Sequence, residues 1–370
     1  MKHLVIIGGG FAGVAAVGAV AKERLTKNLE ITWIDKKGIF EYLPSLPEII
    51  AGRAGPEAFT ADLGPLAKKV GVKLIRDEVK YVDLDSKVVK LDKENIDYDF
   101  LILGVGAETS YFGVKGCEYA YPAYRVDDYM KIVEKLDKVS PGSRITIVGA
   151  GLTGLEVAGA LIDYSKRTEK NLEISIVEKM KSVLPALGSE RASAKAQRFL
   201  ESKGVRFIIG SGVVEVKPDG VELENGAFLE SAMVIWTAGL KPNTLAEKLN
   251  LPKKGGGWVI VEPTVRVKGF EDVYAPGDVN CMIINGKIAM KMAEEAMFQA
   301  EVAVKNIRRH LEGRKLISHR IRFPTDFPKS LVYMGERTLL VYGKRITYLG
   351  RFPYLIKRYI EWKEMRKLRK

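Results

Sequence analysis

Residues 3–13 read His3-Leu-Val-Ile-Ile-Gly-Gly-Gly-Phe-Ala-Gly13, a short apolar run followed by glycines at the spacing GxGxxG. Gly8 permits the tight turn out of a strand, Gly10 lets the backbone approach a pyrophosphate, and Gly13 lets the next helix lie close to the sheet. Small residues continue over positions 14–21, and the amino terminus of such a helix offers free N–H groups to phosphates. The stretch therefore predicts a strand, a phosphate-binding turn and a helix.

An acidic residue completes this first dinucleotide-binding fingerprint. The next apolar strand, residues 31–34, ends in Asp35, which follows Gly13 by 22 residues. A carboxylate at this place accepts hydrogen bonds from ribose hydroxyls. Glycine-rich turns alone are common, so the prediction depends on the agreement of strand, turn, helix and acid.

The same pattern occurs a second time. Residues 144–148 form an apolar strand, followed by Gly149-Ala-Gly151-Leu-Thr-Gly154 and a helical pattern over residues 155–164. A further strand, residues 172–177, ends in Glu178, 24 residues after Gly154. One chain therefore carries two predicted dinucleotide sites.

The composition is that of an ordinary soluble globular protein, with 46% hydrophobic and 28% charged residues among 370. This length allows two or three domains, and the two cysteines exclude a disulfide scaffold and suit a reducing cytosol. No run approaches the roughly 18 uninterrupted apolar residues of a membrane span. The apolar amino terminus contains the first fingerprint, so cleavage as a signal peptide would destroy that site. The histidines are too scattered to predict a metal site; they are His3, His310 and His319.

The chain is organised as two related units, the second inserted in the first. The first unit closes with the buried strand 100–103 and the turn Gly104-Val-Gly106, and the second closes with the similar segment 232–239. The later segment Val273-Tyr-Ala-Pro-Gly277-Asp278 ends in an acid beside glycine, as if the chain returned to the first sheet. Residues 312–370 differ in composition and are expected to form a third, smaller unit.

Several other segments have a recognisable pattern. Residues 72–75, 78–84 and 88–91 are expected to pair as a meander, with residues 205–209 and 221–226 as its counterpart in the second unit. Helical patterns cover residues 126–136 and about 289–311. The proline-interrupted connection 36–52 is neither a clean helix nor a clean strand, and it is expected to run alongside a long cofactor.

Further motifs accompany the two fingerprints. They are Gly104-Val-Gly106-Ala, Val234-Ile-Trp-Thr-Ala-Gly239-Leu-Lys-Pro-Asn243 and Tyr274-Ala-Pro-Gly277-Asp278. Together with the fingerprints they resemble the two-dinucleotide-binding flavoprotein superfamily, in which the first site holds FAD and the second NAD(P)H. Three more motifs narrow the resemblance, along nearly the whole chain, to type II NADH dehydrogenase, the single-subunit NADH:quinone oxidoreductase. They are Pro44-Ser-Leu-Pro-Glu, Thr109-Ser-Tyr-Phe-Gly113 and Leu349-Gly-Arg-Phe-Pro-Tyr-Leu-Ile-Lys-Arg.

The resemblance implies an α/β fold with two Rossmann-like domains and a small C-terminal region that associates with a membrane. The FAD-binding domain would comprise residues 1–112 and 241–311, with the NAD(H)-binding domain inserted at 113–240 and the C-terminal domain at 312–370. The implied site for non-covalent FAD is formed by Gly8, Gly10, Phe11, Ala12, Gly13, Asp35, Lys36, Val79, Gly106, Gly277, Asp278 and Ala293. The implied NADH site is formed by Gly149, Gly151, Gly154, Glu178 and Gly239.

The acid of the second fingerprint bears on the choice of nucleotide. A carboxylate such as Glu178 accepts a hydrogen bond from a ribose 2′-OH but repels a 2′-phosphate, so NADH is expected and NADPH is disfavoured. Lys179, the next residue, is basic and weakens this preference.

Glu156 matches a family glutamate that is expected near the nicotinamide and flavin. The alternative is that Glu156 is an ordinary acid in the first turn of a helix, where it interacts with the helix dipole.

The chain departs from the family where many members have Ala-Gln-x-Ala-x-Gln. Here it reads Met290-Lys291-Met-Ala293-Glu-Glu295, so that Lys291 and Glu295 replace the two glutamines on the quinone side. They are expected either to act at the quinone site or to form an i,i+4 ion pair on a solvated face. A lysine near the flavin pyrimidine edge would favour an anionic reduced flavin.

The basic charge of the chain is concentrated at its end. The last 20 residues hold eight basic and two acidic residues, in a chain of net charge +13. An apolar face flanked by Lys and Arg suits a helix lying in a membrane interface, and packing on the protein's own core or in a homodimer are the alternatives. A nucleic-acid partner is not expected, because no binding motif accompanies the tail. A 3.6-residue period places Phe352, Leu355, Ile356, Tyr359, Ile360 and Trp362 on one side and Lys357, Arg358, Glu361 and Glu364 on the other, followed by Lys363, Arg366, Lys367, Arg369 and Lys370.

The expected function is transfer of hydride from NADH to FAD and then of two electrons to a membrane quinone, without proton pumping, at the cytoplasmic face of the cell membrane. Sulfide:quinone oxidoreductase is the first alternative, but its chemistry uses cysteines beside the flavin, and only Cys117 and Cys281 could serve here. A flavin-binding redox sensor or scaffold is the second. A soluble disulfide reductase is not expected, because the chain has no CxxC or CxxxxC pair.

Overall fold

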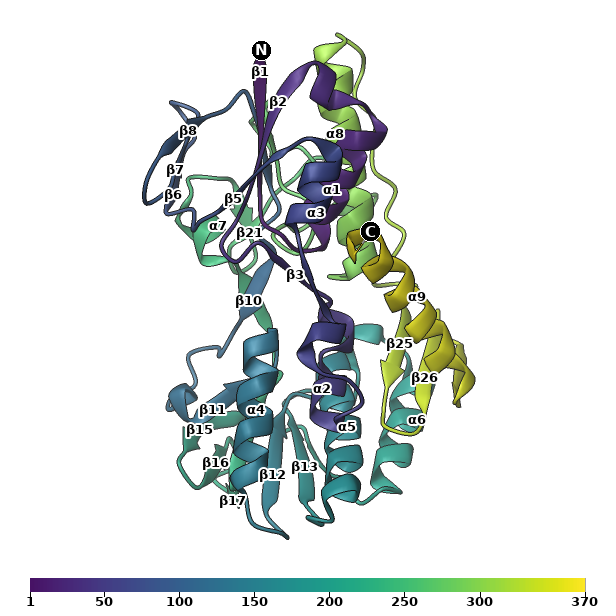
Figure 1. Cartoon of the computed structure of the whole chain (residues 1–370). Coiled ribbons are helices and arrows are strands. Elements are labelled where there is room, and N and C mark those ends of the chain that lie inside the picture. Colours follow the sequence, from purple (N-terminus) through teal and green to yellow (C-terminus); the bar gives the residue numbers. More distant parts are fainter. Residues whose placement is uncertain (370) are drawn as a thin grey trace.

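The computed structural model of the protein describes residues 1–369, and Lys370 of the basic tail lies outside them. These residues fold as two α/β units, one above the other in Figure 1, with the C-terminal helix α9 running diagonally along both. The antiparallel strands β10 (Ala107–Thr109) and β19 (Leu240–Pro242) connect the units.

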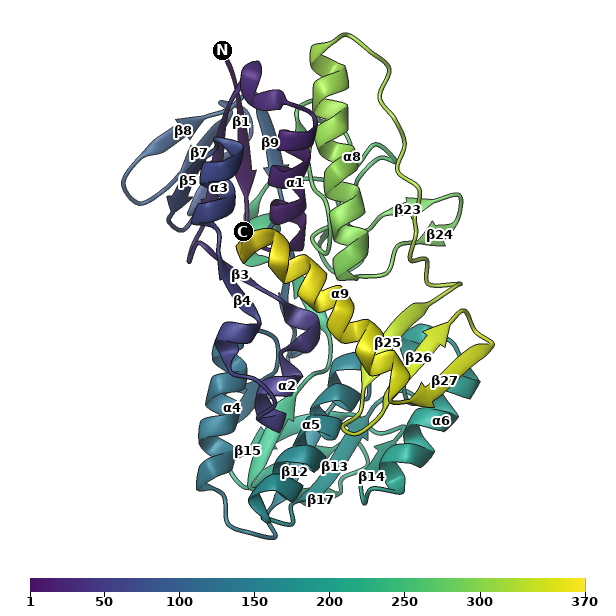
Figure 2. The same ribbon diagram turned by 45° about the vertical axis from the view of Figure 1, so that its right-hand side comes forward.

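The first sheet is parallel, with the strand order β22-β9-β1-β2-β5. Strand β9 is buried throughout, as expected for an apolar strand of a parallel sheet that is covered by helices. Helix α8 (Ala293–Leu311) packs beside α1 (Phe11–Lys22) along this sheet (Figure 2). Because β22 pairs with β9, the chain returns to the first sheet after completing the second. The strands are β1 (Lys2–Ile7), β2 (Leu29–Asp35), β5 (Lys73–Arg76), β9 (Phe100–Leu103) and β22 (Val273–Tyr274).

The second sheet is also parallel, with the strand order β11-β18-β12-β13-β14. The run β18-β12-β13-β14 repeats, strand for strand, the order β9-β1-β2-β5 of the first sheet. The two fingerprints therefore occupy equivalent places in two copies of one architecture. The strands are β11 (Ala120–Pro122), β12 (Arg144–Val148), β13 (Glu173–Glu178), β14 (Arg206–Ile209) and β18 (Met233–Trp236), and the helices are α4 (Val126–Lys138), α5 (Leu152–Thr168) and α6 (Glu190–Glu201).

Each unit also carries a three-stranded antiparallel sheet. The meander predicted over residues 78–91 is present, but the expectation that residues 72–75 join it is wrong. These residues form β5, whose half-buried Leu74 and Ile75 extend the parallel sheet beside β2. The antiparallel strands are β6 (Tyr81–Asp83), β7 (Val88–Lys90) and β8 (Asn95–Asp97) in the first unit, and β15 (Val213–Lys217), β16 (Gly220–Leu223) and β17 (Phe228–Glu230) in the second.

The connection 36–52 has more regular structure than expected, because it contains β3 (Ile39–Glu41) and α2 (Pro47–Ala51). All five residues of α2 are buried, and the helix packs against α4 and α5 of the second unit. A helix this short is marginal on its own, so tertiary packing stabilises it. This segment of the first unit thereby reaches into the second.

The C-terminal region consists of an antiparallel sheet and one helix. The sheet contacts α5 and α6 of the second unit (Figure 2). Its strands are β25 (Lys329–Tyr333), β26 (Thr338–Tyr342) and β27 (Ile346–Gly350), and α9 spans Phe352–Arg369. The remaining elements are β4 (Thr60–Asp62), α3 (Gly64–Val70), α7 (Thr244–Lys248), β20 (Lys253–Lys254), β21 (Trp258–Val259), β23 (Ile283–Ile284), β24 (Lys287–Ile288) and the 3-10 turns Leu25–Lys27, Leu43–Ser45, Pro56–Ala58, Cys117–Tyr119 and Pro185–Leu187.

Helix α9 turns a mixed face toward the protein. Lys357 and Glu361 are buried there together with Met365 and Leu368, whereas four large apolar side chains point outward. The exposed fractions are 63% for Phe352, 63% for Leu355, 62% for Tyr359 and 52% for Trp362. Over residues 1–369, no helix is both long and apolar enough to cross a membrane.

Candidate functional site

The two fingerprint turns have the same backbone geometry. Gly8 and Gly149 both have φ of +107°, a conformation that residues with a side chain rarely adopt. A Cβ on Gly13 would lie 1.9 Å from the Gly8 carbonyl oxygen, and a Cβ on Gly154 would lie 1.9 Å from that of Gly149. Only glycine at these places lets the following helix lie against its strand.

The acid of each fingerprint is bonded to the turn that it follows. Asp35 Oδ2 accepts a hydrogen bond from the Gly9 amide at 2.8 Å, and Glu178 Oε2 accepts one from the Ala150 amide at 2.7 Å. A Cβ on Gly10 or Gly151 would meet no atom of the described chain within 4 Å. Each turn therefore leaves open space where a ligand can approach the backbone.

A cavity of about 1050 Å³ starts at the first fingerprint and extends between the units. Two residues expected to hold FAD, Gly13 and Gly277, are not among the described residues that line it. Gly13 packs against the Gly8 carbonyl, and the Gly277 amide donates to Gln299 Oε1 at 2.8 Å. The other residues expected to hold FAD all line the cavity, namely Gly8, Gly10, Phe11, Ala12, Asp35, Lys36, Val79, Gly106, Asp278 and Ala293.

The second unit contributes the opposite wall of the cavity through the start of α5. Leu152, Thr153 and Glu156 line it, together with Leu240 at the end of the second unit. Among the described lining residues, none is a glycine of the second fingerprint, and neither Glu178 nor Gly239 is included. The structure therefore brings Glu156 into the cavity and leaves the rest of the expected NADH site beside it.

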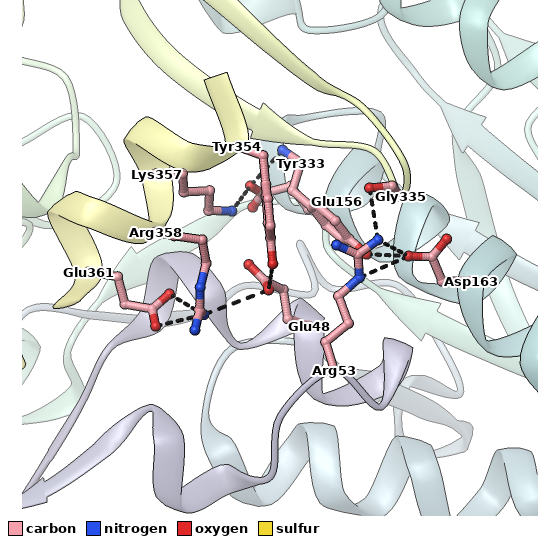
Figure 3. A network of polar contacts seen from close by, with 10 residues as sticks. All are labelled: Glu48, Arg53, Glu156, Asp163, Tyr333, Gly335, Tyr354, Lys357, Arg358 and Glu361. Carbon is pink, nitrogen blue, oxygen red and sulfur yellow. Dashed lines mark hydrogen bonds and ion pairs between the residues drawn. The ribbon is translucent and has the colours of Figure 1, made fainter. Parts of the chain in front are cut away.

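Glu156 forms a buried ion pair with a residue of the C-terminal helix. Its Oε1 lies 2.6 Å from Lys357 Nζ and accepts a hydrogen bond from the Tyr333 amide at 3.1 Å (Figure 3). Burial raises the pKa of the Glu156 carboxyl, and the Lys357 ammonium opposes this shift. Lys357 also lines the cavity, although the sequence pattern had placed it only on the polar side of an amphipathic helix.

The ion pair belongs to a larger polar network that joins α2, α5, β25 and α9 (Figure 3). On one side, Arg358 pairs with Glu361 at 2.7 Å and lies 3.8 Å from Glu48, which accepts from the Tyr354 hydroxyl at 2.8 Å. On the other, Asp163 accepts from Arg53 at 2.7 Å and from the Tyr333 hydroxyl at 2.6 Å. The network holds α9 in place. Glu48, Tyr354 and Arg358 belong to motifs that support the resemblance, but no pattern in the sequence indicated that these side chains meet.

Lys291 lies at the cavity but does not pair with Glu295, so the expected i,i+4 ion pair is wrong. Its Nζ donates to the carbonyl oxygens of Asp278 at 2.8 Å and Asn280 at 2.7 Å, and lies 3.6 Å from the centre of the Trp258 ring. Burial lowers the pKa of Lys291 to about 8. Helix α8 starts only at Ala293, so Lys291 precedes it and helical spacing does not apply.

Glu295 is buried, with 1% of its surface exposed, so it does not lie on a solvated face, and it is not among the described residues that line the large cavity. Its carboxylate pairs with His319 Nε2 at 2.6 Å and accepts from the amides of Arg322 and Phe323, both at 3.0 Å. Burial raises the pKa of this carboxyl, but His319 and the two amides outweigh it and hold the pKa below its usual value. The residue thus fixes the segment that leads to the C-terminal sheet.

The two cysteines lie in different places: Cys281 directly follows Asn280, whose carbonyl accepts from Lys291, and Cys117 lies in a turn of the second unit. Cys117 Sγ donates to the Val114 carbonyl at 2.6 Å, and the described residues that line the large cavity include neither Cys117 nor Cys281. Within residues 1–369, no group of three His, Cys, Asp or Glu side chains is arranged to hold a metal ion.

Comparison with known proteins agrees with this architecture. The chain is 27% identical to the type II NADH:quinone oxidoreductase of Staphylococcus saprophyticus, over 85% of this chain and 83% of that protein. The sulfide:quinone oxidoreductase of Aquifex aeolicus has a similar structure, with a TM-score of 0.87 and 18% sequence identity. The match covers 100% of this chain and 92% of that protein. NDH2 of Plasmodium falciparum, solved in complex with NADH, gives a TM-score of 0.86 and 19% sequence identity. The match covers 98% of this chain and 94% of that protein. The model of the pyridine nucleotide-disulphide oxidoreductase family matches residues 2–305, which contain both fingerprints and the returning strand β22, and the chain belongs to that family.

Proposed function

We propose that this protein is an FAD-dependent NADH:quinone oxidoreductase of the type II NADH dehydrogenase kind, acting without proton pumping. The observation that carries the proposal is a single cavity, which is lined by the first fingerprint, the start of α5, and the C-terminal sheet and helix. FAD bound there would accept hydride from NADH and pass two electrons to a quinone, so the cofactor supplies the redox chemistry. The similarity to the Staphylococcus protein supports this donor and acceptor.

The first unit suits FAD. The open space at Gly10 and the amides at the start of α1 fit a pyrophosphate, and Asp35 at the cavity edge fits a ribose. The first turn of α1 has no acidic side chain that would repel phosphate. The cavity volume of about 1050 Å³ lies at the top of the usual range for ligand pockets, and its lining continues past Val79 and Gly106 to Asp278, as a long dinucleotide needs.

The second unit suits NADH, with Gly151 at the phosphates and Glu178 at the ribose. Glu156 and Lys357 mark where this unit meets the cavity, and we assign them to the surroundings of the nicotinamide. Lys291 also lines the cavity, and its ammonium would stabilise negative charge that develops on reduction. Glu295 is a positioning residue in this proposal, because it acts through the segment that it binds.

The quinone would use the end of the cavity formed by the C-terminal region. Apolar side chains of Phe323, Leu331, Leu340, Val341 and Ile360 line it there, and such a surface suits a lipid-soluble ring. The helix that supplies Ile360 also carries the exposed apolar face described above.

Anaerobic stopped-flow absorbance tests this function. NADH is expected to bleach the oxidised-flavin band of the purified protein rapidly, and a short-chain quinone is expected to restore it. If NADH does not bleach the band, NADH is not the hydride donor and the proposal is refuted. If NADH bleaches the band but no quinone restores it, a quinone is not the acceptor, and a redox sensor or scaffold is favoured.

Sulfide:quinone oxidoreductase is the rival, since the Aquifex protein has nearly the same fold. Its chemistry requires cysteines beside the flavin, whereas the lining residues among positions 1–369 include neither cysteine. Sulfide in place of NADH is therefore expected to leave the flavin oxidised. Rapid bleaching by sulfide alone would overturn the proposal.

Helix α9 is proposed to attach the protein peripherally to the cytoplasmic face of the membrane. Its exposed aromatic and aliphatic side chains lie beside basic residues of its last turns, a combination that suits anionic lipid. Tyr342, Ile346 and Tyr348 are also about half exposed or more, and they lie on strands β26 and β27, which contact α9.

The double variant Leu355→Glu/Trp362→Glu is expected to lower affinity for vesicles containing phosphatidylglycerol by at least roughly tenfold, because each large apolar side chain contributes about 1.5–3 kcal/mol when buried. Flotation of the vesicles measures the bound fraction. Val214→Glu is the matched control, because Val214 is 41% exposed on β15 of the second unit. Unchanged vesicle binding together with loss of a dimer in sedimentation would show that α9 contacts a second copy instead.

A further inference from the structure

Lys179 directly follows Glu178, the acid of the second fingerprint, and its side chain forms an ion pair. Lys179 Nζ lies 2.7 Å from Glu224 Oε1, and Glu224 Oε2 accepts a hydrogen bond from the Gly212 amide at 2.9 Å. Glu224 lies just after β16, in the three-stranded sheet of the second unit. The Lys179 side chain is thereby directed to that sheet, while the neighbouring Glu178 carboxylate bonds to the fingerprint turn.

The backbone on both sides of this ion pair is fixed. The Gly210 amide donates to the carbonyls of Glu178 at 2.8 Å and Met180 at 3.1 Å, so the loop that carries Lys179 cannot shift freely. The Glu224 amide donates to the Gly212 carbonyl at 2.9 Å, so Glu224 is bonded to Gly212 through both its main chain and its side chain. Release of Lys179 from Glu224 therefore requires rotation of the Lys179 side chain, or rotation of the Glu224 side chain with loss of its hydrogen bond to the Gly212 amide.

We infer that Glu224 determines the preference for NADH over NADPH, because it holds Lys179 away from the position of a 2′-phosphate. The inference rests on the proposed binding of NADH at the second fingerprint. In that arrangement the adenosine ribose lies at Glu178, and a basic side chain close to this acid is what accommodates a 2′-phosphate in NADPH-binding proteins. A lysine already paired with a carboxylate is not available for that contact.

The anchoring of Glu224 explains why an exposed pair can have this effect. Both side chains are solvent-accessible, and such pairs contribute little to stability. Here the pair has only to compete with a phosphate for one ammonium group, and the acceptor is held in position by the Gly212 amide. Lys179 and that amide lower the pKa of the Glu224 carboxyl, which therefore stays ionised at neutral pH.

The Glu224→Gln variant tests the inference. It is expected to bind adenosine 2′,5′-bisphosphate about tenfold more tightly relative to AMP than the wild-type protein does, because the released Lys179 ammonium can form a charge-assisted hydrogen bond with the 2′-phosphate. The corresponding ratio of NADPH to NADH efficiency in anaerobic flavin reduction is expected to rise by a similar factor. Adding Lys179→Met should return both ratios to the wild-type values.

Two control variants separate the ion pair from general charge effects. Glu215→Gln changes the net charge equally in the same small sheet, where Glu215 lies 3.5 Å from Lys217 and not beside Lys179, and it should leave the ratios unchanged. Lys181→Met removes the other exposed lysine of the loop and should not abolish the gain in the Glu224→Gln background. An unchanged ratio in Glu224→Gln, or a gain that survives Lys179→Met, would overturn the inference. Because the nucleotide-binding measurement needs no electron transfer, it decides the inference even if NADH fails to reduce the flavin and the proposed function is refuted.

Discussion

A Gly10→Ala protein is expected to fold normally and yet to lose most of its flavin. Gly10 has φ of −78°, which alanine adopts readily, and no described atom lies within 4 Å of the added methyl. The methyl instead fills the space that the backbone leaves for a pyrophosphate. Overfilling a well-packed site costs about 1–3 kcal/mol, which corresponds to roughly 5- to 150-fold weaker binding. The flavin-to-protein absorbance ratio, fluorescence titration with FAD and circular dichroism measure these effects.

The second fingerprint provides the matched experiment. Gly151 has φ of −75° and equally open surroundings, so Gly151→Ala is expected to retain flavin and to raise the KM for NADH by a similar factor. Gly18→Ala is the control, since Gly18 is exposed on α1 and a methyl there meets no described atom within 4 Å. Loss of flavin from Gly151→Ala with retention in Gly10→Ala would reverse the assignment of the two sites.

A Lys357→Met protein is expected to lose about 3 kcal/mol of unfolding free energy at pH 7. The substitution leaves the buried Glu156 carboxylate without its ion-pair partner 2.6 Å away, and breaking such pairs costs about 3–5 kcal/mol. The loss is limited because Glu156 can take up a proton instead, at a cost of about 3 kcal/mol at pH 7 for a carboxyl of ordinary pKa near 4.5. Urea unfolding followed by circular dichroism measures the difference.

The same prediction has a pH dependence of definite sign. In the variant, burial keeps the folded-state pKa of Glu156 raised, so the folded protein holds a proton that the unfolded chain releases above about pH 4.5. The deficit should therefore grow as the pH rises and shrink to below about 1 kcal/mol at pH 5. The double variant Glu156→Gln/Lys357→Met buries no charge and should recover most of the lost stability. An equal deficit at pH 5 and pH 7 would show that packing, and not charge, explains the effect.

The two fingerprint turns could be predicted because their signals are local and contiguous. Gly8, Gly13 and Asp35 lie within one strand-turn-helix-strand unit, and the close approaches that require glycine occur between residues a few positions apart. The exact repetition of the turn, with φ of +107° at both Gly8 and Gly149, shows that the spacing determines the local backbone. Lys179 could be related to nucleotide choice for the same reason, since it directly follows Glu178 in the chain.

The partners of these residues could not be predicted, because they come from distant segments. Lys357 lies 201 residues from Glu156, and nothing in either stretch indicates the other. The pairing of Lys291 with Glu295 was wrong because the rule of i,i+4 contacts holds only inside a helix, and α8 starts at Ala293. Glu224 lies 45 residues from Lys179, and its pairing with Lys179 could not be predicted because it depends on the contact between Glu224 and Gly212 in the folded protein.

The sequence by itself determined the two fingerprints, the α/β architecture and the amphipathic character of the last helix, since each depends on periodicity or on backbone conformations available to glycine. Only the tertiary structure decided which side of that helix faces the protein. Lys357 and Glu361 are buried beside Met365 and Leu368 because Glu156 and the network of Glu48, Arg358 and Tyr354 satisfy their charges there, and Phe352, Leu355, Tyr359 and Trp362 are left outside. Helical periodicity separates two faces but carries no information about what will cover them, because the free energy of burying a charge depends on partners supplied by other parts of the chain.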